Sequence, residues 1–157
     1  GPVKEAILKY SNSYNRTGTL KEVLEGADVL IGVSGPGILD GDDIRRMAAD
    51  PFVFALANPI PEIMPDAAKD AGAASVATGR SDFPNQVNNV LAFPGIFRGA
   101  IDAGAARITD SMKIAASRAI ATSIPNPDPD HILPEALSIE VASHVAEAVC
   151  SAATAKK

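Results

Sequence analysis

The sequence predicts an α/β protein, in which about three parallel strands form half of a doubly wound sheet and C-terminal helices follow. Three short runs, at residues 27–35, 51–59 and 73–79, are apolar at consecutive positions, as in parallel strands that are buried on both faces. Helical patterns separate these runs, which gives the order βαβαβ. Because crossovers between parallel strands are right-handed, we expect one parallel sheet with helices on both faces.

Composition and charge exclude several classes of protein. The chain has 157 residues, of which 46% are hydrophobic and 21% charged, as in a single domain with a core. The net charge is −5 and the basic residues are scattered, so we expect no nucleic-acid partner. No apolar run approaches the roughly 20 residues that span a bilayer, so we expect no membrane partner. The single cysteine, Cys150, cannot form an internal disulfide, which predicts a cytoplasmic location.

Signals for helix ends lie before the first predicted strand and between the strands. Thr19 and Glu22 have the spacing of a capping box, which predicts a helix start in GTLKEVLEGA. Asp40 is suited to be the N-cap of a helix between the first two strands. Pro65 and Gly72 bracket a further helix before the third strand, because proline favours helix starts and glycine favours helix ends.

The chain after the third strand is mostly helical in pattern. Helices are expected in four segments: residues 85–92, 95–105, 109–124 and 138–155. Phe93-Pro94 interrupts the first two, because proline disfavours the helical conformation of the residue before it. Thr109 or Asp110 caps the third. The remaining segment, PNPDPDHILP at residues 125–134, is typical of a proline-rich surface linker.

Polar or glycine-rich residues follow all three predicted strands. They are residues 34–37 (SGPG), Asn58-Pro59 and residues 78–82 (TGRSD). Ligands of open parallel sheets bind beyond the carboxyl ends of the strands, so this coincidence predicts a binding site. A complete dinucleotide-binding sheet needs two βαβαβ halves, with G-x-G-x-x-G in the first. The glycines of GVSGPG lack that spacing, and the sequence has only one βαβαβ pattern. We therefore expect one half of a Rossmann-type sheet.

Uncharged amides gather just beyond the third predicted strand, in GRSDFPNQVNN. In a helix, Asn85, Asn88 and Asn89 would share one face, at i, i+3 and i+4. Apolar residues would occupy the opposite face and pack on the sheet: Val87, Val90 and Leu91. The amide face at a helix N-terminus, where N–H groups are unpaired, could hold a small carboxylate, a cofactor amide or a ribose. The alternative is that these amides only cap helices and satisfy loop backbone.

Two other polar residues at the strand ends also have two interpretations. Arg80 could pair with a substrate carboxylate or with the nearby Asp82. Asn58 could contact a ligand, although Asn-Pro is also a common turn dipeptide. Local chemistry alone does not separate these alternatives.

Three long motifs resemble the malic enzyme family, in particular its shorter prokaryotic-type members. The motifs are GADVLIGVSGPG, MAADPFVFALANPIPEIMP and ATGRSDFPNQVNNVLAFPGIFRGA, and the similarity extends from about residue 20 to the C-terminus. The resemblance implies oxidative decarboxylation of malate to pyruvate and CO₂ with reduction of NAD or NADP, assisted by Mg or Mn. Apart from the resemblance, half a sheet has uncovered edges that invite pairing, so we expect a homo-oligomer.

The resemblance also implies roles for five residues of this sequence. Asn58, in the ANP turn, would contact cofactor and substrate. Asn88 and Asn89 would help to hold the malate carboxylate. Ser34 and Gly35 would lie near the cofactor.

The sequence departs from the family pattern in what it lacks. The catalytic Tyr and Lys, the carboxylate metal ligands and the Gly-rich cofactor turn of the family have no matching motif here, so no catalytic residue or metal ligand is assigned to this chain. The start at Gly1-Pro2 instead of Met is typical of a protease scar, so we expect a piece of a larger protein. Such a piece should not turn over malate, and it should self-associate through its uncovered edges.

This interpretation divides the chain into two parts. Residues 1–124 would be the C-terminal half of an NAD(P)-binding Rossmann-type domain. Residues 125–157 would be a linker and a C-terminal helix that packs on the same domain. Two alternatives remain: a non-catalytic binding or regulatory module that reuses half a dinucleotide-binding fold, and another dehydrogenase with a similar half-domain, such as an amino-acid dehydrogenase.

Overall fold

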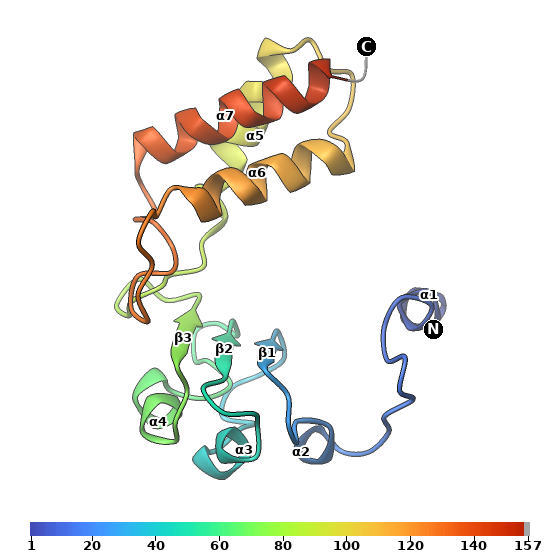
Figure 1. The fold of residues 1–157 in the computed structure, drawn as a ribbon, viewed down its shortest axis with the longest axis vertical. Helices are drawn as coiled ribbons and strands as arrows, with labels where there is room; N and C mark the ends of the chain where they lie inside the picture. Colours follow the sequence, from blue (N-terminus) through green and yellow to red (C-terminus); the bar gives the residue numbers. More distant parts are fainter. Residues whose placement is uncertain (156–157) are drawn as a thin grey trace.

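The computed structural model describes residues 1–155, apart from the side chains of Val3 and Lys4. Its sheet consists of β1 (Val29–Gly32), β2 (Phe52–Ala55) and β3 (Ser75–Thr78), paired in parallel in the order β1-β2-β3. The predicted α/β fold with a three-stranded parallel sheet and C-terminal helices is therefore confirmed. The carboxyl ends of all three strands point toward the layer of C-terminal helices (Figure 1).

Short helices precede the three strands, and they begin where the capping signals predicted. They are α2 (Leu20–Val23), α3 (Gly41–Arg45) and α4 (Pro65–Asp70). Thr19 and Asp40 are the N-caps of α2 and α3, each in a capping box. Pro65 is in the first turn of α4, and Gly72 follows its end with φ of 105°. Apolar side chains of α3, α4, the three strands and the segments that connect them form the first core: Leu24, Leu30, Leu39, Ile44, Met47, Val53, Ala55, Ile63, Ala68, Ala73 and Val76.

The other face of the sheet is not covered at β1, so the prediction of helices on both faces is wrong. Leu30 is buried, whereas its neighbour Ile31 is 66% exposed, and Val29 and Phe52 are exposed on β1 and β2. The reason lies in the strand order. Because the chain moves from β1 to β2 to β3 in one direction, right-handed crossovers place α3 and α4 on the same face.

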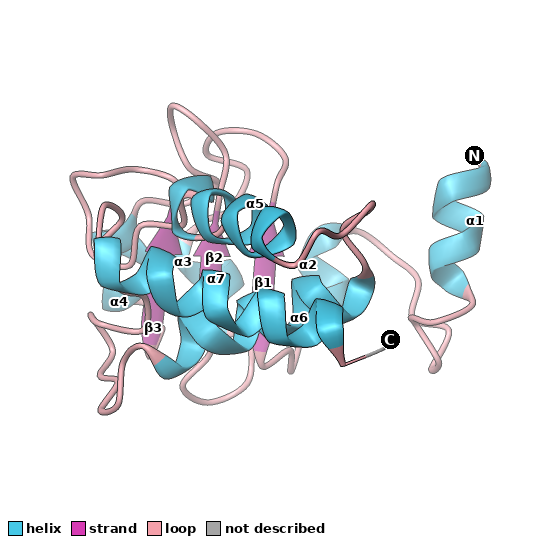
Figure 2. Cartoon of the chain, turned by 90° about the horizontal axis from the view of Figure 1, so that it is seen from above, coloured by secondary structure: helices cyan, strands magenta, loops and turns pink. Residues whose placement is uncertain are grey.

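A helical layer forms the second core. It consists of α5 (Phe93–Asp102), α6 (Asp110–Thr122) and α7 (Ile139–Thr154), with α7 packed on both others. The view from above shows this layer lying over the strand ends (Figure 2). Gly99 permits close packing, since a β-carbon there would come within 2.4 Å of the carbonyl oxygen of Ala146 on α7. Thr109 caps α6 as predicted. Pro94 lies in the first turn of α5, so it belongs to that helix and does not interrupt one.

Residues 125–129 of the proline-rich segment are exposed, as expected of a surface linker, and the segment is also anchored to the sheet layer. The carbonyl of Pro129 accepts hydrogen bonds from Ser75 Oγ at 2.8 Å and from Asn85 Nδ2 at 2.9 Å. Lys69 of α4 forms an ion pair with Asp130. These contacts attach the segment to β3 and α4, and thereby join the two layers.

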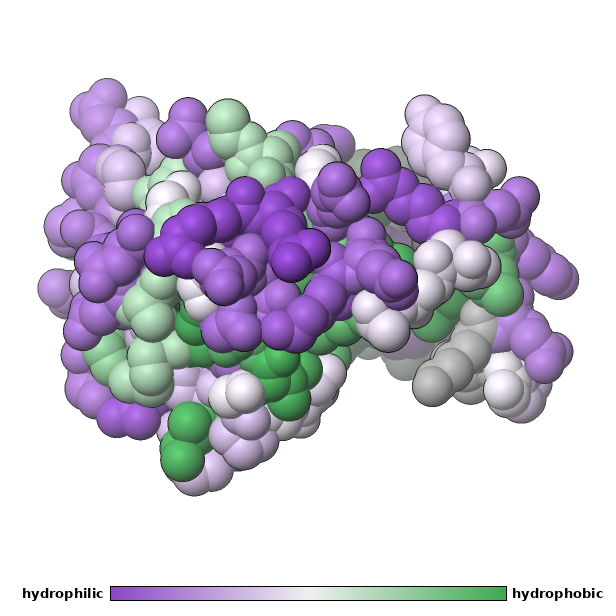
Figure 3. All heavy atoms as spheres, turned by 90° about the horizontal axis from the view of Figure 1, so that it is seen from below, coloured by the Kyte–Doolittle hydropathy of each residue, from purple (hydrophilic) through white to green (hydrophobic). Residues whose placement is uncertain are grey.

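The N-terminal helix α1 (Pro2–Leu8) lies apart from both layers (Figures 1 and 2). The face seen from below is largely hydrophilic, with hydrophobic groups in view across its middle (Figure 3). None of the helices in the described part of the chain is long and apolar enough to cross a bilayer.

Candidate functional site

The loops that follow β1 and β2 meet at one buried carboxylate, that of Glu62. Its Oε1 accepts a hydrogen bond from the backbone N–H of Ser34 at 2.8 Å, and its Oε2 accepts one from Ala57 N–H at 3.0 Å. The side chain is completely shielded from solvent. Glu62 thus links the two loops near their starts, at the carboxyl edge of the sheet.

The loop after β3 touches the loop after β2 through Asn58. A β-carbon built on Gly79 would lie 2.6 Å from Asn58 Nδ2, so the amide rests against the backbone just beyond β3. Asn58 and Ser34 are exposed and Gly35 is half-buried. The structure therefore brings Ser34, Gly35 and Asn58 to one edge, where their polar groups are accessible to a ligand.

Asn85 does not share a helix face with the other amides, contrary to the prediction. Its φ of 55° lies in the left-handed region, which ends any regular helix there. Its Nδ2 donates to the carbonyls of Pro129 and Val76 at 2.9 and 3.2 Å, and its Oδ1 accepts from Ile132 N–H at 2.8 Å. Asn85 is buried, and both polar atoms of its side chain are hydrogen-bonded within the protein, so it is a structural residue.

The expected helix over residues 85–92 is replaced by an extended segment and one short turn. Gln86 forms a parallel bridge with Thr78, and Val87 N–H donates to Thr78 O at 2.8 Å, which draws the chain straight. Only the 3-10 helix η1 (Asn89–Leu91) follows. Leu91 packs in the helical core and not on the sheet.

Asn88 and Asn89 come just after Gln86 and Val87, the two residues that pair with Thr78 at the end of β3. The Oδ1 of Asn88 accepts from Val90 N–H at 3.0 Å and so caps η1. Both side chains are exposed. Asn88 therefore combines a capping role with an accessible amide.

Arg80 is paired with Asp82, which is one of the two interpretations of its role. Its Nε and Nη2 donate to the two carboxylate oxygens of Asp82 at 2.8 and 2.6 Å, and these bonds lower the pKa of Asp82. Its Nη1 also donates to Pro59 O at 3.3 Å. Arg80 thus links the loop after β3 to the loop after β2.

Sequence reasoning missed Glu62, the residue on which the site geometry depends most directly. The signal was present: a single carboxylate lies in PIPEIMP, an otherwise uncharged stretch just after a polar strand end. Gly32 at the end of β1 is the matching feature. A β-carbon there would come within 2.7 Å of Glu62 Cδ, so this position leaves the room that the carboxylate occupies.

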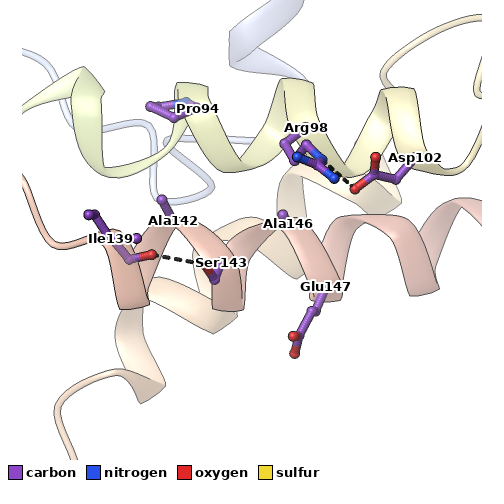
Figure 4. A pocket seen from close by; sticks show the side chains of 8 residues that line it. All are labelled: Pro94, Arg98, Asp102, Ile139, Ala142, Ser143, Ala146 and Glu147. Atoms are coloured by element: carbon purple, nitrogen blue, oxygen red, sulfur yellow. Dashed lines mark hydrogen bonds and ion pairs between the residues drawn. The ribbon is translucent and has the colours of Figure 1, made fainter.

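A hollow of about 480 Å³ lies elsewhere, between α5 and α7 (Figure 4). Its lining residues are Pro94, Arg98, Asp102, Ile139, Ala142, Ser143, Ala146 and Glu147. Arg98 is already paired with Asp102 at 2.6 Å, and Ser143 Oγ donates to Ile139 O at 3.0 Å. None of the predicted site residues lines this hollow, and the cationic side chain that does, Arg98, is paired with Asp102.

The acidic residues and histidines that the structure describes do not gather into a metal site. No group of three or more His, Cys, Asp or Glu side chains within residues 1–155 could hold a metal ion. Asp40, the acidic residue at the start of α3, caps that helix.

Comparison with known proteins gives a consistent result. Residues 3–154 match the family described as "Malic enzyme, NAD binding domain". The bifunctional malic/malolactic enzyme of Bacillus subtilis is 52% identical over 153 residues, which are 96% of this chain and 37% of that protein. The NAD-dependent malic enzyme of Geobacillus stearothermophilus is 48% identical over 97% of this chain and 32% of its own length.

The fold agrees with that of a solved relative. The crystal structure of the NAD-dependent malic enzyme of Thermotoga maritima superposes with a TM-score of 0.92 at 47% identity, covering 96% of this chain and 39% of that chain. The chain spans about a third of the length of the Bacillus subtilis and Geobacillus stearothermophilus enzymes.

Proposed function

The chain belongs to the family of the malic enzyme NAD-binding domain, and on that premise we propose that it forms part of an enzyme that oxidises and decarboxylates malate to pyruvate and CO₂. The observation that carries the proposal is the edge at which Ser34, Asn58 and Gly79 converge around buried Glu62. Ligands of parallel sheets bind at such an edge. NAD or NADP would accept the hydride that leaves malate.

The residues at this edge suit a nicotinamide cofactor and a small acid. Ser34 and Gly35 would lie along the cofactor, with the hydroxyl of Ser34 free to donate or accept. The exposed amide of Asn58 can donate to a carboxylate and accept from a cofactor amide. Asn88 and Asn89 would add amide donors toward the malate carboxylate. These roles rest on the family and on the position of each residue.

We assign no acid, base or metal ligand to this chain. The carboxylate of Glu62 is buried and bonded on both oxygens, and that of Asp82 is paired with Arg80. A Mg or Mn ion would have to be held by residues outside this sequence, and no step is derived through it. The isolated chain is therefore expected to be inactive, with the chemistry supplied by the rest of a larger protein.

The test is a malate-dependent assay of NAD⁺ and NADP⁺ reduction with the full-length protein, beside residues 1–157 alone. We expect the full-length protein to reduce one or both cofactors and to release pyruvate, and the isolated chain to do neither. Failure of the full-length protein would contradict the proposal and favour a non-catalytic binding or regulatory module. Turnover by the isolated chain would refute the claim that its chemistry lies elsewhere.

Asn89 offers a direct test of the substrate role. Its side chain is exposed, so Asn89→Ala should leave the fold intact. We expect a loss of about tenfold or more in kcat/KM for malate, as for the removal of a hydrogen bond to a charged group. Asn126→Ala, in the exposed linker, is the matched control. Equal kinetics for both variants would remove Asn89 from the site.

A further inference from the structure

We propose that Glu62 is a positioning residue for the ligand-binding edge: its buried carboxylate holds the loop after β1 and the loop after β2 in one fixed arrangement. The inference rests on the proposed function in one respect, namely that Ser34 and Asn58 contact the ligands. Glu62 itself is completely buried, so it acts through these neighbours and not on the reacting atoms.

Each carboxylate oxygen of Glu62 accepts a hydrogen bond from a different loop. Oε1 bonds the N–H of Ser34, a proposed cofactor contact, and Oε2 bonds the N–H of Ala57, the residue just before Asn58. Hydrogen bonds to an ionised acceptor are stronger than bonds between neutral groups, and a buried one is costly to leave unmade. Both proposed contacts are therefore fixed by the same group.

The backbone beside Glu62 extends this attachment along the first loop. Gly37 N–H donates to Pro61 O at 3.1 Å, and Leu39 N–H donates to Glu62 O at 3.1 Å. Together with the bond from Ser34, three points of residues 34–39 are held by Pro61 and Glu62. The first loop is thus positioned by the segment that follows β2.

Gly32 provides a second, independent line of evidence. At this position in β1, a β-carbon would come within 2.7 Å of Glu62 Cδ and 2.8 Å of Oε1. Gly32 is buried and adjoins the loop, so the carboxylate passes directly beneath the start of that loop. Gly32→Ala should therefore displace the carboxylate without changing its charge.

The experiment measures steady-state kinetics of Glu62→Gln and Glu62→Asp in the full-length protein, below the thermal midpoint of every variant. Gln has the same size, but its NH₂ group must face one of the two backbone N–H donors. We expect KM for cofactor and malate to rise about tenfold or more in Glu62→Gln. We expect Glu62→Asp, which keeps the charge, to recover part of the loss.

Met47→Ala is the matched control for a purely structural role. Met47 is buried in the first core, and its backbone N–H donates to Ile44 O at 3.0 Å and not to either loop. Its truncation should lower the thermal midpoint and leave both KM values unchanged. If Glu62→Gln behaves like Met47→Ala, with lower stability and unchanged KM, the positioning role is refuted.

Amide hydrogen exchange on the same full-length variants separates this inference from the proposed function. Glu62→Gln and Gly32→Ala should accelerate exchange at Ser34, Ala57 and their loop neighbours more than in the three strands. If the wild-type protein does not oxidise malate, the proposed function fails while the exchange result still decides whether Glu62 fixes the loops. Unchanged exchange in these loops would overturn the inference in either case.

Discussion

The side-chain amide of Asn58 rests so closely on the backbone of Gly79 that a β-carbon at position 79 would lie 2.6 Å from Asn58 Nδ2. This contact joins the carboxyl ends of β2 and β3. It also fixes where the amide can present itself to a ligand, because the side chain is exposed on its other side.

Gly79→Ala should therefore affect ligand binding more than stability. The crowded atom is the end of a flexible side chain, so the amide can move aside and the free energy of unfolding should change by about 1 kcal/mol or less. The displaced amide should raise KM for malate or cofactor in the full-length protein. Gly41→Ala is the control, since the nearest atom to its β-carbon would be at 3.4 Å.

Unchanged KM values in Gly79→Ala, together with a thermal midpoint near that of wild type, would contradict a ligand contact by Asn58. A large loss of stability would instead mean that the amide cannot move. Thermal unfolding and steady-state kinetics on the same preparation distinguish these results.

The sequence signals that depend on near neighbours predicted the structure well. Thr19, Asp40 and Thr109 cap helices where expected, because each needs only an N–H group two or three residues away. The three strands lie inside the three apolar runs, and the polar strand ends gather at one edge because the strands are parallel. Strand order then decided what periodicity could not, namely that α3 and α4 cover only one face.

The features that sequence analysis predicted wrongly or missed depend on contacts between residues far apart in the chain. Asn85 bonds Pro129, which is 44 residues away, and that contact outweighs any local tendency to form a helix. Glu62 bonds Ser34 across 28 residues, and although its isolated carboxylate in PIPEIMP is a local signal, nothing near it indicates that Ser34 is the partner. The gathering of the polar strand ends at one edge could therefore be predicted from sequence, whereas the contacts that hold these loops together could not.

Asn85→Ala should strongly destabilise the protein. It removes hydrogen bonds to Pro129, Val76 and Ile132, takes away the side-chain acceptor of the Ile132 N–H, and places alanine at a φ of 55°. We expect a loss of about 2–4 kcal/mol in the free energy of unfolding, measured by urea denaturation. Asn126→Ala should change it by less than about 0.5 kcal/mol.

Asn85→Gly separates the two causes of this loss. Glycine accepts the left-handed conformation at little cost but still lacks the amide. If the hydrogen bonds matter most, Asn85→Gly should remain close to Asn85→Ala in stability. A glycine variant as stable as wild type would show that backbone conformation, and not the anchoring of residues 125–134, is what Asn85 provides.

Asp40 should make stability depend on pH in the acid range. The hydrogen bond from Lys21, followed by that from Asp43 N–H, holds the pKa of Asp40 below its usual value. A carboxyl with a lowered pKa in the folded state adds stability above its unfolded pKa of about 3.9, and this contribution is lost as pH falls through the folded value. Stability should therefore decline below about pH 4.

Asp40→Asn provides the comparison, because asparagine is an equally good N-cap but does not titrate. Urea midpoints of the two proteins should differ at neutral pH and converge as the pH falls below about 4. Curves that stay parallel over the whole range would contradict a contribution from the charge of Asp40.

The isolated chain should self-associate through the uncovered side of β1. This edge strand carries exposed Val29 and Ile31, and Val33 just beyond it is 77% exposed. Such an edge has unpaired backbone groups and no charged side chain within β1 to oppose pairing with a second copy. Sedimentation velocity of residues 1–157 should show a dimer or larger species whose fraction rises with concentration. Ile31→Lys should lower that fraction, because it places a charge in the contact.

Ile101→Lys, on the exposed side of α5, is the matched control and should leave association unchanged. A monomer at high concentration would refute the prediction, and loss of association only in Ile101→Lys would move the interface to the helical layer.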